Sequence, residues 1–377
     1  MSRIVALLCA ALAILVAPAQ AQQPPIRVPV LVPLTGFLSL EGTSQRNGAV
    51  LALEAAPPAL GVVFDIGDTA TSPEAAVNAF ERALSVSKEA VAAVVAPMLG
   101  TQMLALLPLA AVYEVPLVTV SGTATITEMG NPYIFRFFPG DAVVKTAHAR
   151  YAVEELGARR PAILYQTTAY GQSGREHLTR VLTEMGAPPV ASEGLDVAVK
   201  DMLPALSKVQ SARADVLLLH LHSGPTALVI RQAAAMGLGL PIVAGSAMHQ
   251  PATAALLEPA ELAGVCAESG SSPISGGDAA MDEWVARYRS AFGAEPDAFA
   301  LGQYDAVQMV LAAVAGGARD PDAVRAALAG GSHKGLAMTY RSDGKGNMAH
   351  DAVIICYDGK SRMPSIAKRY ANVTRLR

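Results

Sequence analysis

Short apolar runs alternate with amphipathic stretches along most of this chain of 377 residues. Short runs rich in valine, isoleucine and leucine are typical of buried parallel strands, and the stretches between them have the apolar spacing of helices. A repeated strand, helix, strand order brings the strands together in parallel and covers both faces of the sheet with helices. The sequence therefore predicts an α/β fold. The predicted strands are residues 28–32, 62–66, 94–96, 117–120, 162–165, 216–221 and 242–244.

This alternation runs twice, which predicts two doubly wound parallel-sheet lobes. The segment 138–141 combines a proline, a glycine and a helix-capping aspartate between the two runs, and the segment 268–277 is rich in serine and glycine. Such segments suit passages of the chain from one lobe to the other. Beyond them the pattern changes to three helices and two late strands. These are predicted at 281–292, 296–315, 320–329, 336–340 and 352–357.

Residues 1–21 have the features of a secretory signal peptide. Arg3 precedes an apolar core at 4–16, and the small-residue pattern AQA at 19–21 marks a cleavage site. The apolar core is too short to span a bilayer permanently, and we expect no later segment to be long and apolar enough to do so. The mature chain is therefore expected in the periplasm.

Charge and cysteine content add two constraints. The formal net charge is −3 and no basic run or stripe is present, so neither nucleic acid nor a membrane surface is an expected partner. Cys266 and Cys356 remain after cleavage of the leader, and an oxidising periplasm permits them to pair. Both lie in apolar, strand-like runs, so two buried thiols fit the sequence as well as a disulfide does.

A cluster of small polar residues follows one predicted strand directly. The sequence PLVTVSGTAT passes from an apolar run into Ser121, Gly122 and Thr123. The carboxyl ends of parallel strands are where open α/β sheets hold their ligands. Backbone N–H groups and small hydroxyls can hold a carboxylate or another polar head, but they cannot by themselves activate a nucleophile. The cluster indicates binding without chemistry.

Enzyme signatures are mostly absent. The chain has no dinucleotide or phosphate-binding glycine motif, no G-x-S-x-G and no H-E-x-x-H. Ser173 follows a glycine, but the spacing is not that of a nucleophile turn, and we expect it to cap the next helix. His220 and His222, with His249 near the next strand end, fit a zinc site only weakly, because no further ligand is tied to them by spacing. We expect His222 to line a cleft and His220 to be packed or at its rim.

Two further residues lie after predicted strands. Tyr170, in TTAYGQSG, is placed to cover a ligand in the second lobe, although a tyrosine before glycine is also a common turn residue. Glu41, in TGFLSLEGTSQ, belongs to the first strand-to-helix loop, where it either faces the cleft or is a solvated charge. We favour the cleft.

Several long blocks, in the correct order, resemble the periplasmic leucine/isoleucine/valine-type substrate-binding proteins of ABC importers. The blocks are PLTGFLSLEGTSQRNGAVLALE, DTATSPEAAVNAFERAL, PLVTVSGTATITEMGNPYIFRFFPGDAV, AILYQTTAYGQSG, VIRQAAAMGL and ALGQYDAVQMVLAAV. The resemblance implies a type I binding-protein fold, in which two α/β lobes joined by three hinge crossings close on a small ligand. It places the third crossing near 341–348.

The resemblance also suggests a pocket, with departures. Family members hold the ligand carboxylate with hydroxyls in two first-lobe loops. Here Ser121 and Thr123 match the second loop, while the first loop contains Leu99, then Gly100 where a serine is usual, so that Thr101 substitutes.

In the second lobe Tyr170 matches the family aromatic, and a family tyrosine falls on His222. The acid that meets the ligand's amino group falls on Ser246, and a first-loop tyrosine falls on Glu41. An unpaired buried ammonium is costly, so the lost acid argues for a changed substrate unless Glu41 compensates.

The sequence therefore predicts the solute-binding component of an ABC importer. The predicted partners are a small polar or carboxylate-bearing ligand and the membrane permease subunits; no cofactor and no catalysis are expected, and the protein is expected to be a monomer. The first lobe is predicted at 22–139 plus 274–342 and the second at 140–273 plus 343–377. A sensory receptor of the same fold and, less favoured, an exported metal-dependent hydrolase are the alternatives.

Overall fold

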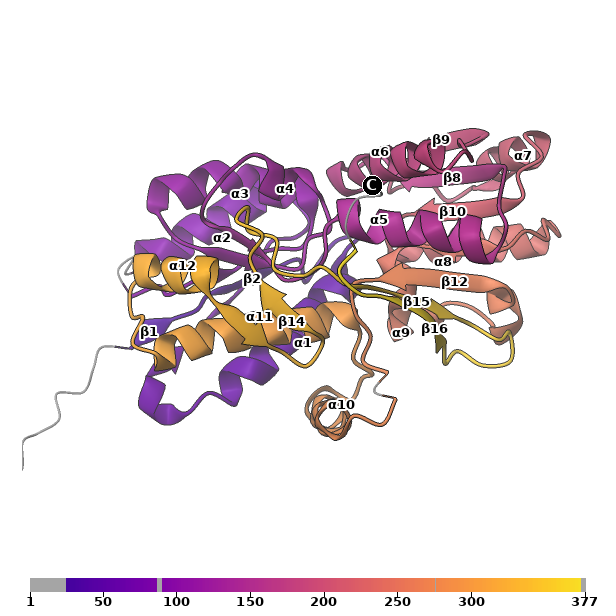
Figure 1. The fold of residues 1–377 in the computed structure, drawn as a ribbon. Coiled ribbons are helices and arrows are strands. Elements are labelled where there is room, and N and C mark those ends of the chain that lie inside the picture. Colours follow the sequence, from indigo (N-terminus) through magenta and orange to yellow (C-terminus); the bar gives the residue numbers. More distant parts are fainter. Residues whose placement is uncertain (1–24, 87–89, 275, 374–377) are drawn as a thin grey trace, which may run out of the picture.

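The computed structural model describes residues 25–86, 90–274 and 276–373, so the predicted signal peptide lies outside the described residues. Two sheets, each covered by helices, lie side by side and are joined by several passages of the chain (Figure 1). We call the unit around the five-stranded sheet the first lobe and the unit around the seven-stranded sheet the second lobe.

The first lobe is built on a parallel sheet of order β4-β2-β5-β6-β7, with β1 and β3 paired separately beside it. Successive residues of β2 point to opposite faces of the sheet. Val30 and Val32 pack in the apolar core formed with α1 and α11, whereas Leu31 packs in the core formed with α2 and α3. The strands are β1 Ile26–Arg27, β2 Val30–Val32, β3 Val62–Val63, β4 Ile66–Asp68, β5 Val94–Val95, β6 Leu117–Thr119 and β7 Ile134–Arg136.

Helices from both ends of the described chain complete this lobe. The late helices α11 and α12, orange in Figure 1, lie against the early strands. The helices are α1 Ser39–Glu54, α2 Pro73–Ser85, α3 Gly100–Tyr113, α4 Thr125–Glu128, α10 Ala279–Phe292, α11 Ala298–Ala315 and α12 Pro321–Gly330; β13 Ser332–Lys334 and β14 Thr339–Arg341 form a hairpin.

The second lobe is built on a sheet of order β16-β15-β12-β11-β10-β8-β9. Five strands are parallel, but β15 and β16 are antiparallel, so this sheet is mixed and not wholly parallel as predicted. The strands are β8 Pro161–Gln166, β9 Ala191–Leu195, β10 Val216–His220, β11 Ile242–Ala244, β12 Val265–Ser269, β15 Ala352–Cys356 and β16 Ser365–Tyr370. The helices are α5 Asp141–Arg150, α6 Ala169–Glu184, α7 Leu203–Ser211, α8 Ser223–Ala235 and α9 Pro251–Ala254.

The chain passes between the sheets after β7, after β12 and between β14 and β15. The first and third passages are tied together, because the buried guanidinium of Arg136 donates to the side-chain oxygen of Asn347 and to the backbone oxygen of Thr123. A Cβ on Gly140 would lie 2.4 Å from Arg136 Nη2, so the close approach of the first passage requires glycine there.

One expectation about apolar segments is wrong. Helix α11 has 18 residues and a mean hydropathy of 1.3, which is long and apolar enough to cross a membrane by length and composition. It is instead 78% buried inside the protein, where it packs along α1. A Cβ on Gly48 of α1 would lie 2.1 Å from the Ala300 backbone oxygen, so the two helices are in close backbone contact.

The two cysteines form a disulfide. Cys266 of β12 and Cys356 of β15 are directly paired residues on neighbouring antiparallel strands, with their Cα atoms 4.0 Å apart. The sequence left this open, because the antiparallel return of β15 onto β12 is a tertiary feature. The disulfide closes a chain separation of 90 residues within the second lobe.

Candidate functional site

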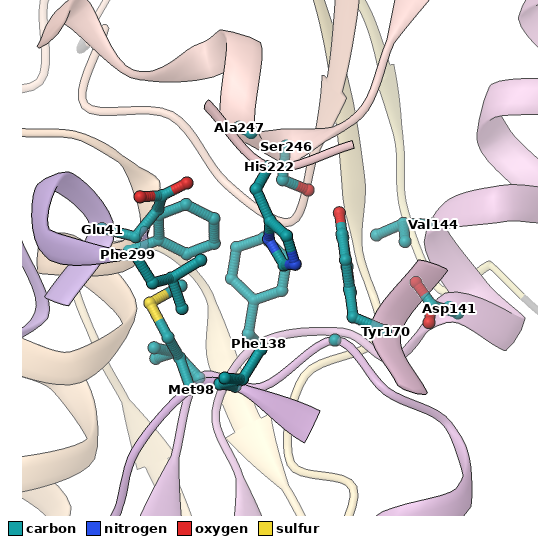
Figure 2. Close-up of a pocket in the computed structure, with 14 residues that line it drawn as sticks. Glu41, Met98, Phe138, Asp141, Val144, Tyr170, His222, Ser246, Ala247 and Phe299 are labelled. Carbon is teal, nitrogen blue, oxygen red and sulfur yellow. The ribbon is translucent and has the colours of Figure 1, made fainter. Parts of the chain in front are cut away.

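A cavity lies where the carboxyl ends of the two sheets meet (Figure 2). Its empty space is about 460 Å³, a figure that includes space open to solvent. Both lobes contribute walls. The lining residues are Leu38, Glu41, Met98, Leu99, Val120, Gly122, Phe138, Asp141, Val144, Tyr170, His222, Ser246, Ala247 and Phe299.

Strand ends position the polar side chains of this cavity. Glu41 stands in the first turn of α1 after β2, Tyr170 at the start of α6 after β8, His222 directly after β10, and Ser246 directly after β11. Parallel strands bring all these ends to one edge of each sheet, and the two edges face each other. Residues separated by up to 261 positions in sequence, Leu38 and Phe299, therefore share one cavity.

The second-lobe wall is aromatic and neutral. The rings of Tyr170 and His222 stack with their centroids 5.3 Å apart. The centroid of the Phe37 ring, from the first lobe, also lies 5.3 Å from that of His222. Burial lowers the pKa of His222 to about 3, and its Nε2 lies 3.2 Å from the Thr168 hydroxyl. Burial also holds the pKa of Tyr170 well above its usual value. This wall offers neutral rings, not cations, to a ligand.

Glu41 spans the gap between the lobes. Its Oε1 accepts hydrogen bonds from the backbone N–H of Ser223 at 3.0 Å and from the Ser223 hydroxyl at 2.5 Å, at the start of α8. Burial raises the pKa of the Glu41 carboxyl, and the hydrogen bonds from Ser223 oppose that rise. Its Oε2 is buried and has no hydrogen-bond partner among the described residues.

A second carboxyl group, Asp141, lies on the opposite side of the cavity beyond Tyr170 (Figure 2). It is buried in the first turn of α5, and neither of its side-chain oxygens has a partner within hydrogen-bonding distance among the described residues. Burial raises the pKa of Asp141 to about 7, while the positive charge of Lys145 opposes this rise. Asp141 is therefore an acid that can gain or lose its proton near neutral pH.

A third acid lies behind Ser246 but is already paired. Glu268, at the end of β12, accepts from the ammonium of Lys145, and both side chains are fully buried. The Ser246 hydroxyl donates to the other Glu268 oxygen at 3.1 Å. Since Lys145 matches its charge, Glu268 is not a free anion at the place where the family resemblance predicted an acid.

The hydroxyls of the PLVTVSGTAT segment lie next to the cavity lining. Gly122 lines the cavity, and the flanking hydroxyls of Ser121 and Thr123 are buried without a hydrogen-bond partner in the described part of the chain. Thr101 and Gly100 do not line the cavity. A Cβ on Gly100 would lie 2.1 Å from Thr123 Oγ1, so Thr123 occupies the space that a larger residue at this position would need.

Of the ten predicted ligand-binding residues, six line the cavity: Glu41, Leu99, Gly122, Tyr170, His222 and Ser246. Sequence reasoning missed Asp141, which it assigned only to helix capping, and the apolar walls around Phe138 and Phe299. The double phenylalanine before Pro139 was the available signal for Phe138, whereas Phe299 comes from a helix far along the chain.

The histidines do not gather as a zinc site. His220 Nε2 donates to the Tyr170 backbone oxygen at 3.0 Å, and its ring packs on the Tyr170 ring. Within the described ranges, no group of three His, Cys, Asp or Glu side chains is placed to hold a metal ion. His222 lines the cavity and His220 is fully buried beside it, which is the arrangement that the sequence favoured.

Ser173 differs from its expected role. Helix α6 begins earlier, at Ala169, and Thr168 caps it by accepting from the Gly171 N–H. Ser173 lies one turn inside the helix, and its hydroxyl accepts from the Ala124 N–H of the first lobe at 3.0 Å. The residue therefore joins the two lobes beside the cavity.

Comparisons with known proteins agree with this architecture. A family model described as periplasmic binding protein matches residues 25–360. The Leu/Ile/Val-binding protein homolog 1 of Brucella suis is 28% identical over 317 residues, which cover 80% of this chain and 82% of that protein.

Two solved structures are similar over almost their whole length. LivJ of Streptococcus pneumoniae, a branched-chain amino acid transporter substrate-binding protein in complex with isoleucine, has a TM-score of 0.82 at 22% identity, covering 91% of this chain and 99% of LivJ. A solute-binding protein of an ABC transporter from Rhodopseudomonas palustris, in complex with 3,4-dihydroxybenzoic acid, has a TM-score of 0.82 at 22% identity, with coverages of 93% and 98%. At these identities the likeness establishes the fold, and it confirms the predicted two-lobed α/β architecture.

Proposed function

Because the chain belongs to the periplasmic binding protein family, we propose that it is the solute-binding component of an ABC importer, which captures a small ligand between its lobes and delivers it to membrane permease subunits. Its relatives are named as Leu/Ile/Val-binding proteins and its structural neighbours as substrate- or solute-binding proteins of transporters, and the chain is accordingly not an enzyme. The family is periplasmic or extracytoplasmic.

The observation that carries the proposal is a cavity whose walls come from both lobes, which are joined by hydrogen bonds. Besides the Glu41 and Ser173 contacts, Gln250 of the second lobe donates to the Asp297 carboxylate at 2.6 Å, next to α11 of the first lobe. A ligand held by both walls favours the closed arrangement over an open one by its differential affinity. A permease that recognises both lobes together can then distinguish loaded protein from empty protein.

The proposal includes how the chain is divided and exported. The signal peptide would be residues 1–21, and cleavage would leave a mature chain that begins at Gln22. The first lobe would comprise 22–139 and 274–342, and the second 140–273 and 343–377, joined by the passages at 138–141, 268–277 and 341–348. This division is supported by the two sheets, since β8 to β12 and β15 to β16 share one sheet. The protein would act as a monomer.

The ligand would be a compact molecule with an apolar body and at least one polar head. The apolar walls around Met98, Leu99, Phe138 and Phe299 suit an aliphatic or aromatic body. The polar head would meet Ser121, Gly122 and Thr123 from the first lobe, or Tyr170, His222 and Ser246 from the second. Gly100 would support this pocket from behind Thr123, and Thr101 follows it in the first turn of α3. Relatives named for leucine, isoleucine and valine, and neighbours with benzoates, fall in this size class.

A ligand screen tests the proposal directly. Thermal unfolding of the mature protein is measured with aliphatic amino acids, benzoate and hydroxybenzoates, short-chain acids, amides and small amines. A true ligand at a hundred times its dissociation constant stabilises the fold by about 2.7 kcal/mol. Uptake of that ligand is then measured in cells that lack this protein and in cells that regain it. Uptake that does not depend on the protein would contradict the importer role.

A further inference from the structure

Glu41 is exceptional among the cavity's polar residues because its two carboxylate oxygens have different surroundings. Oε1 is satisfied by Ser223 across the lobe boundary, at the positive N-terminal end of α8. Oε2 has no partner among the described residues, although the side chain is only 1% exposed. A buried carboxylate oxygen without a partner costs free energy that a hydrogen-bond donor in the cavity would recover.

None of the cavity-lining residues can supply that donor as a cation. No lysine or arginine lines the cavity. The nearest buried cations of the site are already engaged, Lys145 with Glu268 and Arg136 with Asn347 and Thr123. The lining rings of Tyr170 and His222 are neutral. A positive group that approaches Oε2 must therefore come from the ligand.

The surroundings of Glu41 also indicate the rest of the ligand. Phe299, Met98 and Phe138 line the same cavity as the Glu41 carboxylate (Figure 2). An ammonium group at Oε2 would leave the attached carbon skeleton against these apolar side chains. A ligand whose only polar group is an anion would instead bring negative charge toward Glu41.

We propose that Glu41 is the specificity-determining residue of this cavity: its Oε2 accepts a hydrogen bond from a protonated nitrogen of the ligand, while its Oε1 holds helix α8 of the second lobe. One side chain then couples the presence of a nitrogen in the ligand to closure of the lobes. This inference rests on the proposed function, and it deepens it by assigning the ligand to the small amines and amino compounds with an apolar body.

Matched compounds that differ only in the nitrogen test this assignment. Titration calorimetry compares L-leucine with 4-methylpentanoate, L-phenylalanine with 3-phenylpropanoate, and phenethylamine with 2-phenylethanol, for the wild type and for Glu41→Gln. In at least one pair the wild type should bind the nitrogen-bearing member about tenfold more tightly or better, as expected for a hydrogen bond with charged partners. Glu41→Gln should reduce this ratio toward one, mainly by weakening the nitrogen-bearing member.

A matched control lies on the same helix. Glu54→Gln at the exposed end of α1 removes the same charge away from the cavity, and it should keep the wild-type ratio. Should Glu41→Gln fail to fold, Glu41→Asp, which keeps the charge but withdraws it by one methylene, should also lower the ratio.

Three results would overturn the assignment. They are equal or tighter binding of the nitrogen-free members by the wild type, an unchanged ratio in Glu41→Gln, and binding of other screened compounds without binding of any nitrogen-bearing one. In each case the protein still binds a ligand, so the proposed function stands. If no compound of the full ligand screen binds, both the assignment and the proposed function fail.

Discussion

Gly100 faces Thr123 at a distance that leaves no room for a side chain. A Cβ at position 100 would lie 2.1 Å from Thr123 Oγ1 and 2.8 Å from Thr123 Cβ. Both atoms belong to a buried residue beside the cavity, so neither can move freely. The missing side chain of Gly100 is thus matched by the bulk of Thr123, and the two positions form one packing unit.

Gly100→Ala should therefore destabilise the protein. Forcing a methyl group into this contact should lower the free energy of unfolding by about 1–3 kcal/mol, which is the usual cost of overpacking a buried site. Gly330→Ala is the control, because Gly330 is the exposed last residue of α12 and a Cβ there would meet nothing within 4 Å. Urea unfolding of both variants gives the comparison. Equal stabilities of the two variants would contradict the packing described for Gly100.

Asp141 makes stability depend on pH. Its pKa is raised to about 7 by burial, so the folded state keeps the proton at pH values where the unfolded state has lost it. The resulting contribution of Asp141 to the free energy of unfolding is fully present below the unfolded pKa of about 4, and it is lost as pH rises toward the folded pKa of about 7. The groups that act on the carboxyl include Lys145, Ser173, Glu268 and Arg136, and His220 Nε2 lies 3.6 Å from Asp141 Oδ1.

Asp141→Asn mimics the protonated acid and should remove this contribution to the pH dependence. Relative to the variant, the wild type should lose unfolding free energy between pH 4 and pH 7, with a magnitude of the order of 4 kcal/mol. Urea unfolding at half-unit pH intervals measures the difference. If the wild type instead gains unfolding free energy relative to Asp141→Asn as pH rises, the pKa of Asp141 is lowered in the folded state. That result would contradict the burial effect described here.

At the scale of elements, the pairing of β12 with β15 fastens the late part of the chain to the second lobe. The strands meet antiparallel, and the disulfide between Cys266 and Cys356 joins them at directly opposed positions. The hydroxyl of Tyr151, the residue directly after α5, lies 3.2 Å from the Cys356 sulfur. Neither cysteine lines the cavity.

Replacing both cysteines by serine should weaken the fold without changing ligand affinity. Loss of a native disulfide typically lowers the free energy of unfolding by about 2–5 kcal/mol, more for a long closed loop such as this one. Guanidinium unfolding and calorimetric ligand titration are measured on the same preparation, with reduced wild type as the control. A large loss of affinity at unchanged stability would mean that the disulfide serves the cavity and not the sheet.

Sequence reasoning located most of the strongly buried strands, but it missed the buried β7 as well as the edge strands β9 and β16. The single strand predicted at 62–66 is wrong, because this segment contains β3 and β4, which belong to different sheets. The buried apolar strands β2, β5, β6, β8, β10 and β11 were all predicted, because every residue of such a strand is apolar or nearly so. Strand β9 reads ASEGL and alternates between half-buried and exposed residues before the buried Leu195, and β16 reads SIAKRY with mostly exposed side chains. Their pairing comes from neighbouring strands, which the local pattern does not contain.

The site was predictable to the same degree and for the same reason. Tyr170, His222, Ser246 and Gly122 follow buried strands directly, so their position at the sheet edge could be inferred from local order. The contact of Glu41 with Ser223 joins residues 182 positions apart and depends on how the lobes meet. Asp141 likewise reaches the cavity only because the first passage carries α5 past the end of β6.

At the scale of the whole molecule, the cavity exists only while the lobes are together. Glu41, Ala124 and Asp297 of the first lobe each hydrogen-bond to the second, and Arg136 with Asn347 ties two passages that join the lobes. The contacts at the cleft include these hydrogen bonds and the Phe37–His222 ring contact, whereas each lobe has its own apolar cores on both faces of its sheet. Rotation of the lobes can therefore open the cleft without disturbing either core.

Small-angle X-ray scattering, recorded on the mature protein before and after saturation with a ligand from the screen, tests this account most directly. Ligand-free protein should contain an opened population, so saturation should reduce the radius of gyration and bring the scattering curve to that of the compact arrangement described here. Identical curves with and without saturating ligand would contradict the claim that two lobes close around their ligand.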